Sequence, residues 1–233
     1  MNTNIITAVV VAASAIGIGA MIYGTSVKKA GEETTQSTST SNLNRFEPVV
    51  LTGSVAGLPQ KVDGKVLVVD VFNYGCGHCA VIHSINDEVY KRNADKIHLV
   101  KISAPFAQWN QYTHLFYALN SLGIEDKVSP DIFSAIHEKK VKDLNLGSQA
   151  LTDILNKHKV SIEEFTKAYN DPSIPEKVAQ SLEVLKAYKI ESTPTMIVDN
   201  EKKFGPSINQ GYAEAAFAME NSIKENFDKI SKK

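Results

Sequence analysis

The spacing of hydrophobic residues in the first third of the soluble part predicts two strands and a helix. Residues 65–73 (KVLVVDVFN) form an almost continuous β-branched apolar run, which is typical of a strand buried on both faces. Gly75 and Gly77 end this run, and residues 80–92 then show apolar positions at helical spacing. Residues 96–102 (KIHLVKI) predict the next strand. A strand, a helix and a strand of these lengths form a βαβ unit, so we expect two parallel strands.

The middle of the chain carries only helical patterns. One apolar helix face is formed by Trp109, Tyr112, Phe116 and Leu119. Ser129 and Pro130 have the order of an N-cap followed by a first-turn proline, and residues 161–164 (SIEE) form a capping box. Residues 176–189 predict a further helix. We therefore expect about four helices in a row after the βαβ unit.

The last 40 residues return to strands. Residues 195–198 (TMIV) predict a short strand, residues 202–204 a second strand that pairs back with it, and residues 211–227 a closing helix. The helical block then separates two halves of one sheet, so it is an insertion and not a tandem domain. We predict an α/β fold with a first half at residues 45–107, an inserted helical subdomain at 108–189 and a second half at 190–233.

The N-terminal 44 residues differ from the rest. Residues 5–23 hold no charged side chain, and this length is close to the roughly 20 residues that cross a bilayer as a helix. A buried core helix is disfavoured because no polar face interrupts the run. We predict that residues 1–24 are a signal peptide or a single membrane anchor. Residues 25–44 are a Ser/Thr-rich linker that cannot bury a core.

Composition and charge exclude several classes of protein. The chain has 25 Lys and Arg against 26 Asp and Glu, a net charge of −1, so we expect no nucleic-acid partner. With 43% hydrophobic and 22% charged residues it is neither fully disordered nor a multi-span membrane protein. Two cysteines cannot build a disulfide-rich miniprotein or a four-cysteine zinc site.

Both cysteines lie in Cys76-Gly77-His78-Cys79, where the buried strand turns into a helix. A helix N-terminus favours an anion, and the thiolate is the reactive form of cysteine, so this position activates Cys76. His78 would add a hydrogen-bond donor or a positive charge beside the sulfur. Cys79, one turn further on, would resolve a mixed disulfide formed at Cys76. A purely structural disulfide is a weaker interpretation, because so small a loop gives little stability. We also expect no metal, because a site would need two more ligands, His78 and His83 point only partly the same way, and there is no second cysteine pair.

The chain resembles a known family at these positions. The strand–CGHC–helix order, the inserted helices and residues 192–195 (STPT) are similar to the DsbA-like thiol:disulfide oxidoreductases of the thioredoxin superfamily, over residues 48–227. The resemblance implies a thioredoxin fold with an inserted α-helical subdomain. It also implies dithiol chemistry that needs no cofactor.

Further site residues follow from this resemblance. Pro194 matches the family's cis-proline, and Thr193 before it would present its main chain to a bound peptide. Without the CGHC sequence, an ordinary proline at a strand edge would be the preferred interpretation. Asp70 matches a buried acid that exchanges a proton with Cys79, with Lys101 as its partner. The alternative is an aspartate that faces solvent at the end of the sheet.

The direction of the reaction stays open. The Gly-His dipeptide is similar to that of disulfide isomerases, and Thr193 is similar to the residue of isomerases and reductases. His78 and the helix N-terminus favour an oxidase. The roughly 20 residues between linker and first strand are too few for a dimerisation module, so we expect a monomer. A reductase or isomerase, or a redox-inert peptide-binding module, are the alternatives.

Location and partners are further expectations. Lys28 and Lys29 follow the apolar run and no Lys or Arg precedes it, which favours a cytoplasmic domain. Disulfide-forming chemistry requires an oxidising compartment, and this argument outweighs the charge pattern. We expect a periplasmic protein, soluble or tethered through residues 5–23, that acts on reduced exported proteins. The family implies a quinone-linked membrane partner that reoxidises it.

Overall fold

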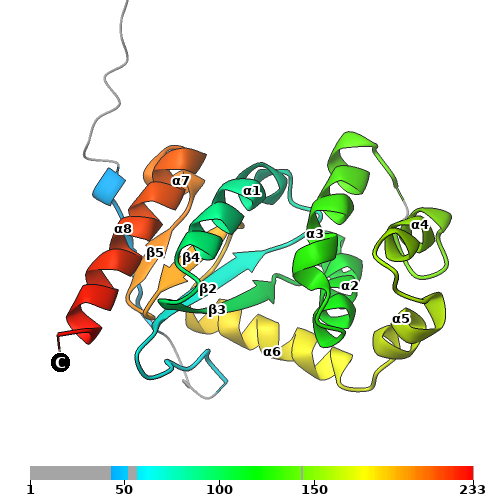
Figure 1. Ribbon diagram of the computed structural model, residues 1–233, viewed down its shortest axis with the longest axis horizontal. Helices are drawn as coiled ribbons and strands as arrows, with labels where there is room; N and C mark the ends of the chain where they lie inside the picture. Colours follow the sequence, from blue (N-terminus) through cyan, green and yellow to red (C-terminus); the bar gives the residue numbers. More distant parts are fainter. Residues whose placement is uncertain (1–42, 52–56, 143, 233) are drawn as a thin grey trace, which may run out of the picture. The chain divides into compact units, whose positions relative to one another are not determined.

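The computed structural model describes residues 43–51, 57–142 and 144–232. Its sheet has the strand order β1-β5-β4-β2-β3 (Figure 1). The strands are β1 (Glu47–Pro48), β2 (Val66–Phe72), β3 (Ile97–Ser103), β4 (Thr195–Val198) and β5 (Lys202–Phe204). β2 and β3 are parallel, as the βαβ pattern predicts, and the other neighbours are antiparallel. The four predicted strands are confirmed to within a residue at either end; β1, with two residues, has no pattern long enough to detect.

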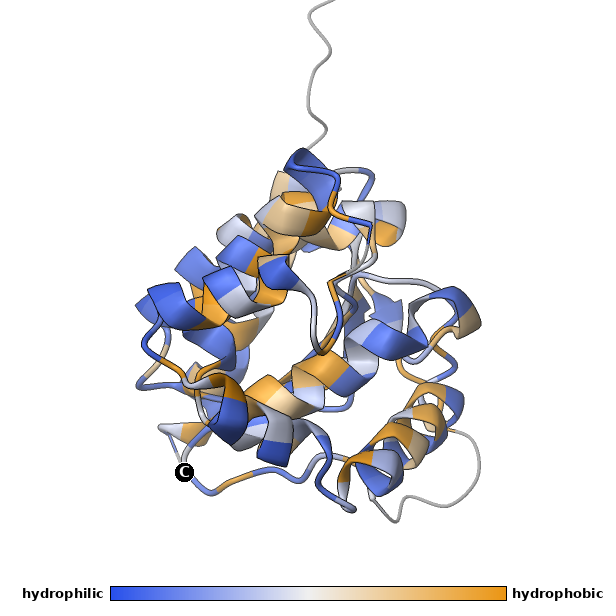
Figure 2. Ribbon diagram, turned by 90° about the vertical axis from the view of Figure 1, so that its right-hand side faces the viewer, coloured by the Kyte–Doolittle hydropathy of each residue, from blue (hydrophilic) through white to orange (hydrophobic). Residues whose placement is uncertain are grey.

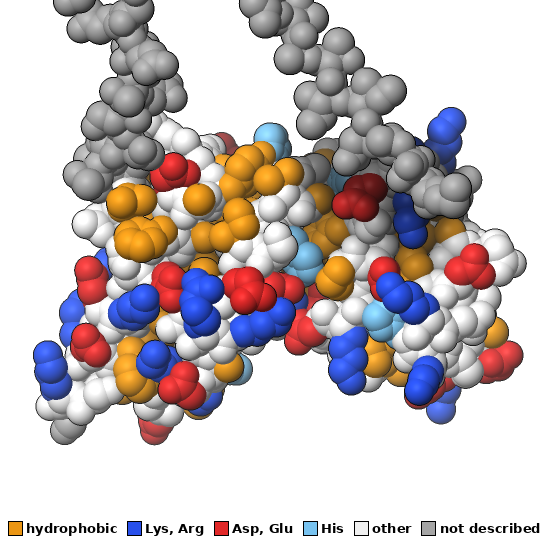
Figure 3. All heavy atoms as spheres, turned by 45° about the horizontal axis from the view of Figure 1, so that its top comes forward, with side chains coloured by type: hydrophobic (Ala, Val, Ile, Leu, Met, Phe, Trp, Pro, Cys, Tyr) orange, Lys and Arg blue, Asp and Glu red, His pale blue; other side chains and the backbone are white. Residues whose placement is uncertain are grey.

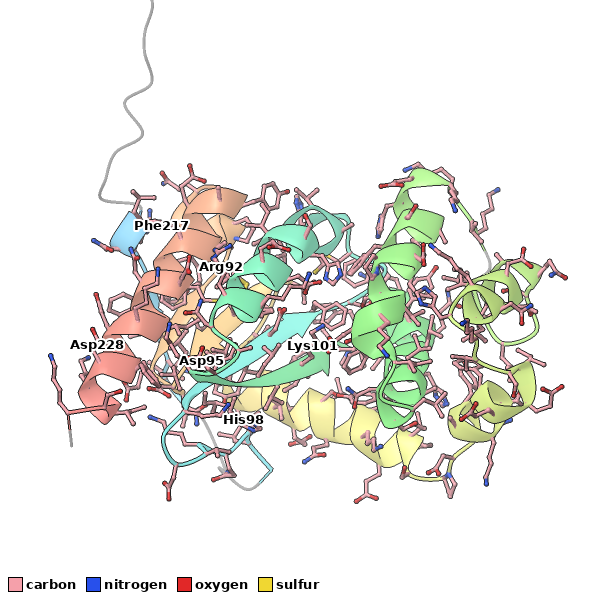
Figure 4. The ribbon with its side chains drawn as sticks, viewed as in Figure 1. Arg92, Asp95, His98, Lys101, Phe217 and Asp228 are labelled. Carbon is pink, nitrogen blue, oxygen red and sulfur yellow. The ribbon has the colours of Figure 1, made fainter. Side chains whose placement is uncertain are left out.

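Helices cover both faces of the sheet, which explains why β2 is apolar along its whole length. Val66 and Val68 pack in a cluster with α1 (Gly77–Arg92) and α8 (Tyr212–Ile230). Leu67 and Val69, which point the other way, pack against α6 (Ile174–Ala187). Arg92 of α1 lies at the boundary with α8 and binds Glu220 at 3.1 Å (Figure 4).

The helical segments from η2 to α5 form their own core at one end of the strands, whereas α6 packs on the sheet. The segments of this core are η2 (Ala107–Trp109), α2 (Asn110–Ser121), α3 (Glu125–Phe133), η3 (Ser134–Glu138), α4 (Gln149–Lys157) and α5 (Ile162–Tyr169). Helices in Figure 2 carry both hydrophobic and hydrophilic residues, as expected for helices that pack one face on a core. This core continues into Phe72, Tyr74 and both cysteines. The insertion therefore packs directly on the CGHC segment.

Two local predictions for these helices have opposite outcomes. Ser161 caps α5, because its Oγ accepts the Glu164 N–H at 3.0 Å, as the capping box predicts. The N-cap prediction at Ser129 is wrong, because α3 begins four residues earlier and Pro130 lies inside it. An acidic first turn stabilises this earlier start. Pro130 costs α3 one backbone hydrogen bond.

The rest of the second half matches its pattern. After β5 come the short α7 (Pro206–Asn209) and then α8, which begins one residue later and ends three residues later than predicted. Within the described ranges, no helix is both long enough and apolar enough to cross a membrane. The predicted signal or anchor at residues 1–24, and all but the last two residues of the predicted linker, lie outside those ranges.

Candidate functional site

Cys76 is the N-cap residue of α1, with an extended backbone at φ −84° and ψ 115°. Its Sγ accepts the backbone N–H of Cys79 at 3.4 Å, and its own N–H donates to the Asn73 carbonyl at 3.0 Å. On the other side, Sγ lies 3.4 Å from the Thr193 carbonyl oxygen. Both cysteines are free thiols in this structure. The strand–Gly–helix pattern thus places Cys76 where the sequence predicts it.

The two thiols have opposite acidities. The pKa of Cys76 is lowered from 9.0 to about 5, mainly by the hydrogen bond with the Cys79 side chain. Burial opposes this shift, while the backbone N–H groups of Cys79 and His78 add to it. Burial raises the pKa of Cys79, and the neighbouring Cys76 raises it further. At neutral pH the structure therefore holds a thiolate at Cys76 and a thiol at Cys79.

Contrary to the expectation from the sequence, the side chain of His78 does not lie as a donor beside the Cys76 sulfur. Its side chain is exposed, and Nδ1 lies 2.6 Å from the hydroxyl of Tyr212, the first residue of α8. In the described part of the chain, the hydrogen bond of the ring goes to Tyr212 and not to the sulfur. The contribution of His78 to the Cys76 thiolate comes from its backbone N–H. Tyr212 was not predicted as a site residue, because no pattern within α8 indicates which neighbour it meets.

The Thr193–Pro194 peptide bond is cis, as the resemblance implies, and both residues are buried opposite Cys76. Gly205 follows β5, and a Cβ added there would lie 2.9 Å from the Pro194 carbonyl oxygen, so glycine permits the close approach. Beside Pro194 is a mainly apolar groove of about 460 Å³. Its lining residues are His78, Ser192, Thr193, Pro194, Pro206, Ser207, Gly211 and Tyr212. Figure 3 shows hydrophobic side chains gathered on this face of the molecule.

Asp70 lies on β2 beneath α1 and is only 7% exposed, so the solvent-facing alternative is wrong. Together with Cys79 and Pro194 it lines a small cavity of about 10 Å³, close to the space of one water molecule. Burial raises the pKa of Asp70 from 3.8 to about 6, against the opposing influence of Lys101 and Tyr90. A carboxyl group with this pKa can take up and release a proton near neutral pH.

Lys101 is the register neighbour of Asp70, but it binds other carboxylates. Its Nζ lies 3.0 Å from Glu125 Oε2 and 2.6 Å from Asp126 Oδ1, both in α3. Of the ion pairs among the described residues, none joins Lys101 to Asp70, so the predicted partner acts on Asp70 through its charge and not through an ion pair. Figure 4 shows Lys101 near the end of β3, where the strand runs toward α3. Lys101 still favours the Asp70 carboxylate through its charge.

The structure adds a buried network that the sequence did not indicate. Glu125 is 3% exposed, and it accepts hydrogen bonds from the Tyr74 hydroxyl at 2.9 Å and from Ser129. Tyr74 lies two residues before Cys76. A Glu-Asp pair at a helix start reads as a solvated first turn, and only the packing of α3 on β3 shows that Glu125 is buried. The network thus ties the inserted subdomain to the segment that leads into the cysteines.

Known proteins are similar to this chain in sequence and in fold. The thioredoxin family model matches residues 61–216. The thiol:disulfide interchange protein DsbA of Burkholderia cepacia is 35% identical over 175 residues, which are 73% of this chain and 82% of that protein. DsbA of Pseudomonas syringae pv. tomato is 33% identical over 64% of this chain and 69% of its own. The crystal structure of Pseudomonas aeruginosa DsbA superposes with a TM-score of 0.68 at 25% identity, covering 82% of this chain and 95% of its own.

These similarities confirm the predicted fold class, a thioredoxin fold with an inserted α-helical subdomain. They also agree with the geometry of a dithiol pair at a helix N-terminus. The chain belongs to the DsbA family of thiol:disulfide interchange proteins, and it is a protein disulfide oxidoreductase of that family.

Proposed function

We propose that the protein introduces disulfide bonds into exported proteins, with Cys76 as the sulfur that exchanges with substrate and Cys79 as the resolving sulfur. The observation that carries this proposal is the pKa of Cys76, lowered to about 5 at the N-cap of α1. A stabilised thiolate favours the reduced form of the pair, which makes the oxidised form a strong oxidant.

The exchange proceeds in two steps that transfer two electrons. In the oxidised form, a substrate thiolate attacks Cys76 Sγ, a mixed disulfide forms, and Cys79 leaves. The raised pKa of Cys79 means that this sulfur takes up a proton, and Asp70 across the small shared cavity supplies it. A second substrate thiolate then attacks the substrate sulfur of the mixed disulfide. The substrate leaves with a disulfide, and Cys76 departs as a stable thiolate.

Thr193 and Pro194 are the proposed peptide-binding residues. The apolar groove beside them opens next to Cys76, so a segment that follows the substrate cysteine has a surface to bind. His78 lines this groove with its ring, which supports a role in substrate contact rather than in thiolate stabilisation. Lys101 acts on Asp70 through its charge alone.

The proposed location is the periplasm, where disulfides persist. Residues 1–24 would direct export, as a cleaved signal or as a retained anchor. The protein would act as a monomer on reduced exported proteins, and a quinone-linked membrane protein would reoxidise it. Digestion of intact spheroplasts by added protease tests the location, since a protected domain would contradict it.

The reduction potential of the Cys76–Cys79 pair, measured against glutathione, tests the reaction itself. We expect a value of about −120 to −180 mV, the range of known oxidants and isomerases. A value near −270 mV, as in thioredoxin, would instead identify a reductase. With a peptide whose single cysteine is supplied as its glutathione disulfide, Cys79→Ser should form a stable mixed disulfide and release glutathione, whereas Cys76→Ser, whose remaining thiol is buried with a raised pKa, should form none. Peptide binding that is unchanged in Cys76→Ser, with no exchange in the wild type, would indicate a redox-inert binding module.

A further inference from the structure

The three residues before Cys76 are held by the inserted subdomain and its flanking loop. The Asn73 amide donates to the Ala104 carbonyl at 2.9 Å and to Thr113 Oγ1 of α2 at 3.1 Å. The Tyr74 hydroxyl is bound within α3, as described above. At Gly75, an added Cβ would lie 2.4 Å from the indole ring of Trp109, so the ring packs directly on the backbone.

His137 also contacts this segment, and it lies beside the residue that follows Cys76. Its Nε2 lies 2.7 Å from the Tyr74 carbonyl oxygen. A carbonyl can only accept, so Nε2 carries the hydrogen of this bond. On the other side of the ring, Nδ1 lies 4.0 Å from the position of a Cβ on Gly77, the residue after Cys76. The half-buried imidazole therefore lies against the backbone on both sides of Cys76.

The backbone that carries His137 is unusual. η3 is a five-residue π-helical segment that follows α3, closed by the bond from the Lys139 N–H to the Ser134 carbonyl at 3.0 Å. The wider turn rotates His137 relative to a continued α-helix. Such segments are rare and occur often at functional sites. The ring of Phe133, centred 6.1 Å away, packs against the imidazole and limits its orientation.

We propose that His137 is a positioning residue for the redox centre. By holding the Tyr74 carbonyl and lying against Gly77, it fixes the turn that keeps Cys76 at the N-cap of α1, where the N–H groups of α1 stabilise the thiolate. His137 itself takes no part in the thiol–disulfide exchange. The inference rests on the proposed role of Cys76, and it links the inserted subdomain to the acidity of that sulfur.

Loss of the His137 contact should change the pKa of Cys76 in one direction. A looser turn aligns the Cys79 and His78 N–H groups less well with Sγ, so the pKa of Cys76 rises and the oxidised form becomes a weaker oxidant. The net contribution of one hydrogen bond corresponds to a factor of about two to ten in an equilibrium constant.

The test compares variants of the full chain. His137→Ala should lower the equilibrium constant for oxidation of glutathione about two- to tenfold and raise the thiolate midpoint of Cys76, followed by ultraviolet absorbance. His137→Gln should restore both values toward wild type, because its amide can donate to the Tyr74 carbonyl. His158→Gln is the matched control, since His158 lies 2.7 Å from Asp131 inside the same subdomain and should leave both values unchanged.

Wild-type values in His137→Ala would overturn the proposal, as would equal shifts in His158→Gln or a failure of His137→Gln to restore them. If His137→Ala does not fold in a urea titration, His137→Leu replaces it as the variant without a donor. A wild-type protein that exchanges no disulfide with glutathione would contradict the proposed function instead. The Cys76 thiolate midpoint tests His137 in either case.

Discussion

Cys76 and Cys79 are one helical turn apart, yet their surroundings shift their pKa values in opposite directions. Cys76 lies at the N-cap, where backbone N–H groups and the Cys79 thiol stabilise its charge. Cys79 lies inside the first turn, 2% exposed and packed over Asp70, where burial disfavours charge. The same side chain is thus stable as a thiolate in one position and takes up a proton in the other. The position of each cysteine relative to the N-terminus of α1 decides in which direction its pKa shifts.

The two buried acids below the cysteines show a parallel contrast. Asp70 faces a water-sized cavity without a bound cation, and its pKa of about 6 lets it change protonation near neutral pH. Glu125 is enclosed by Lys101, Tyr74 and Ser129, which hold its charge in a fixed network. One carboxyl group is suited to move a proton, and the other to hold α3 against β3.

The largest expected effect is the difference between the pH midpoints at which Cys76 and Cys79 become thiolates. In a spectroscopic pH titration of the reduced protein, one thiolate should form near pH 5 and the second only above pH 9. Cys79→Ser should keep a midpoint well below 9, because serine also donates to the Cys76 sulfur. Cys76→Ser should show no thiolate below pH 9. Midpoints near 9 in both variants would remove the contrast between the cysteines.

Lys101→Met should show how strongly the Glu125 network depends on its cation. Both side chains are more than nine-tenths buried, so the variant leaves an uncompensated carboxylate. We expect a loss of about 3–5 kcal/mol in the free energy of unfolding at pH 8, measured in urea. The deficit should shrink as the pH falls through the raised pKa of Glu125, because protonation removes the buried charge. The double variant Lys101→Met/Glu125→Gln should recover most of it, and no recovery would contradict this account.

Asp70→Asn should raise the free energy of unfolding, whereas Lys101→Met should lower it. The folded pKa of about 6 lies above the unfolded value of 3.8, so the folded state binds the proton more tightly and wild-type stability falls as the pH rises through this interval. The variant lacks this loss. We expect it to be more stable than wild type by about 3 kcal/mol at pH 8 and equally stable below about pH 4.

Activity provides the second measurement for Asp70→Asn. Release of Cys79 from the mixed disulfide should slow, because its proton donor is gone. A gain in stability that is the same at both pH values would show that Asp70 does not titrate in this range.

Local patterns in the sequence account for much of this architecture. The buried run at β2, the two glycines after it and the spacing of α1 suffice to place Cys76 at a helix N-terminus. The partner of Lys101 was not predictable in the same way, because Glu125 reaches it only when α3 packs across the end of β3. The position of the His137 side chain depends on the π-helical segment η3, which no residue pattern predicts. Contacts made within one turn could be predicted, and contacts between the sheet and the insertion could not.

The smallest expected effect lies in the insertion. α2 and α4 both end in the same hydrogen-bond pattern, with Gly123 (φ +66°) at the left-handed position of one and Lys159 (φ +60°) at that of the other. A lysine in this conformation has a steric cost that glycine lacks. Lys159→Gly should raise the free energy of unfolding in urea by about 1 kcal/mol or less, since glycine also gains entropy in the unfolded chain. It should leave both thiolate midpoints unchanged, because stability gained in α4 does not alter the N-cap of α1; a shifted Cys76 midpoint would mean that the whole insertion, and not only the contacts around Tyr74, sets the acidity of that sulfur.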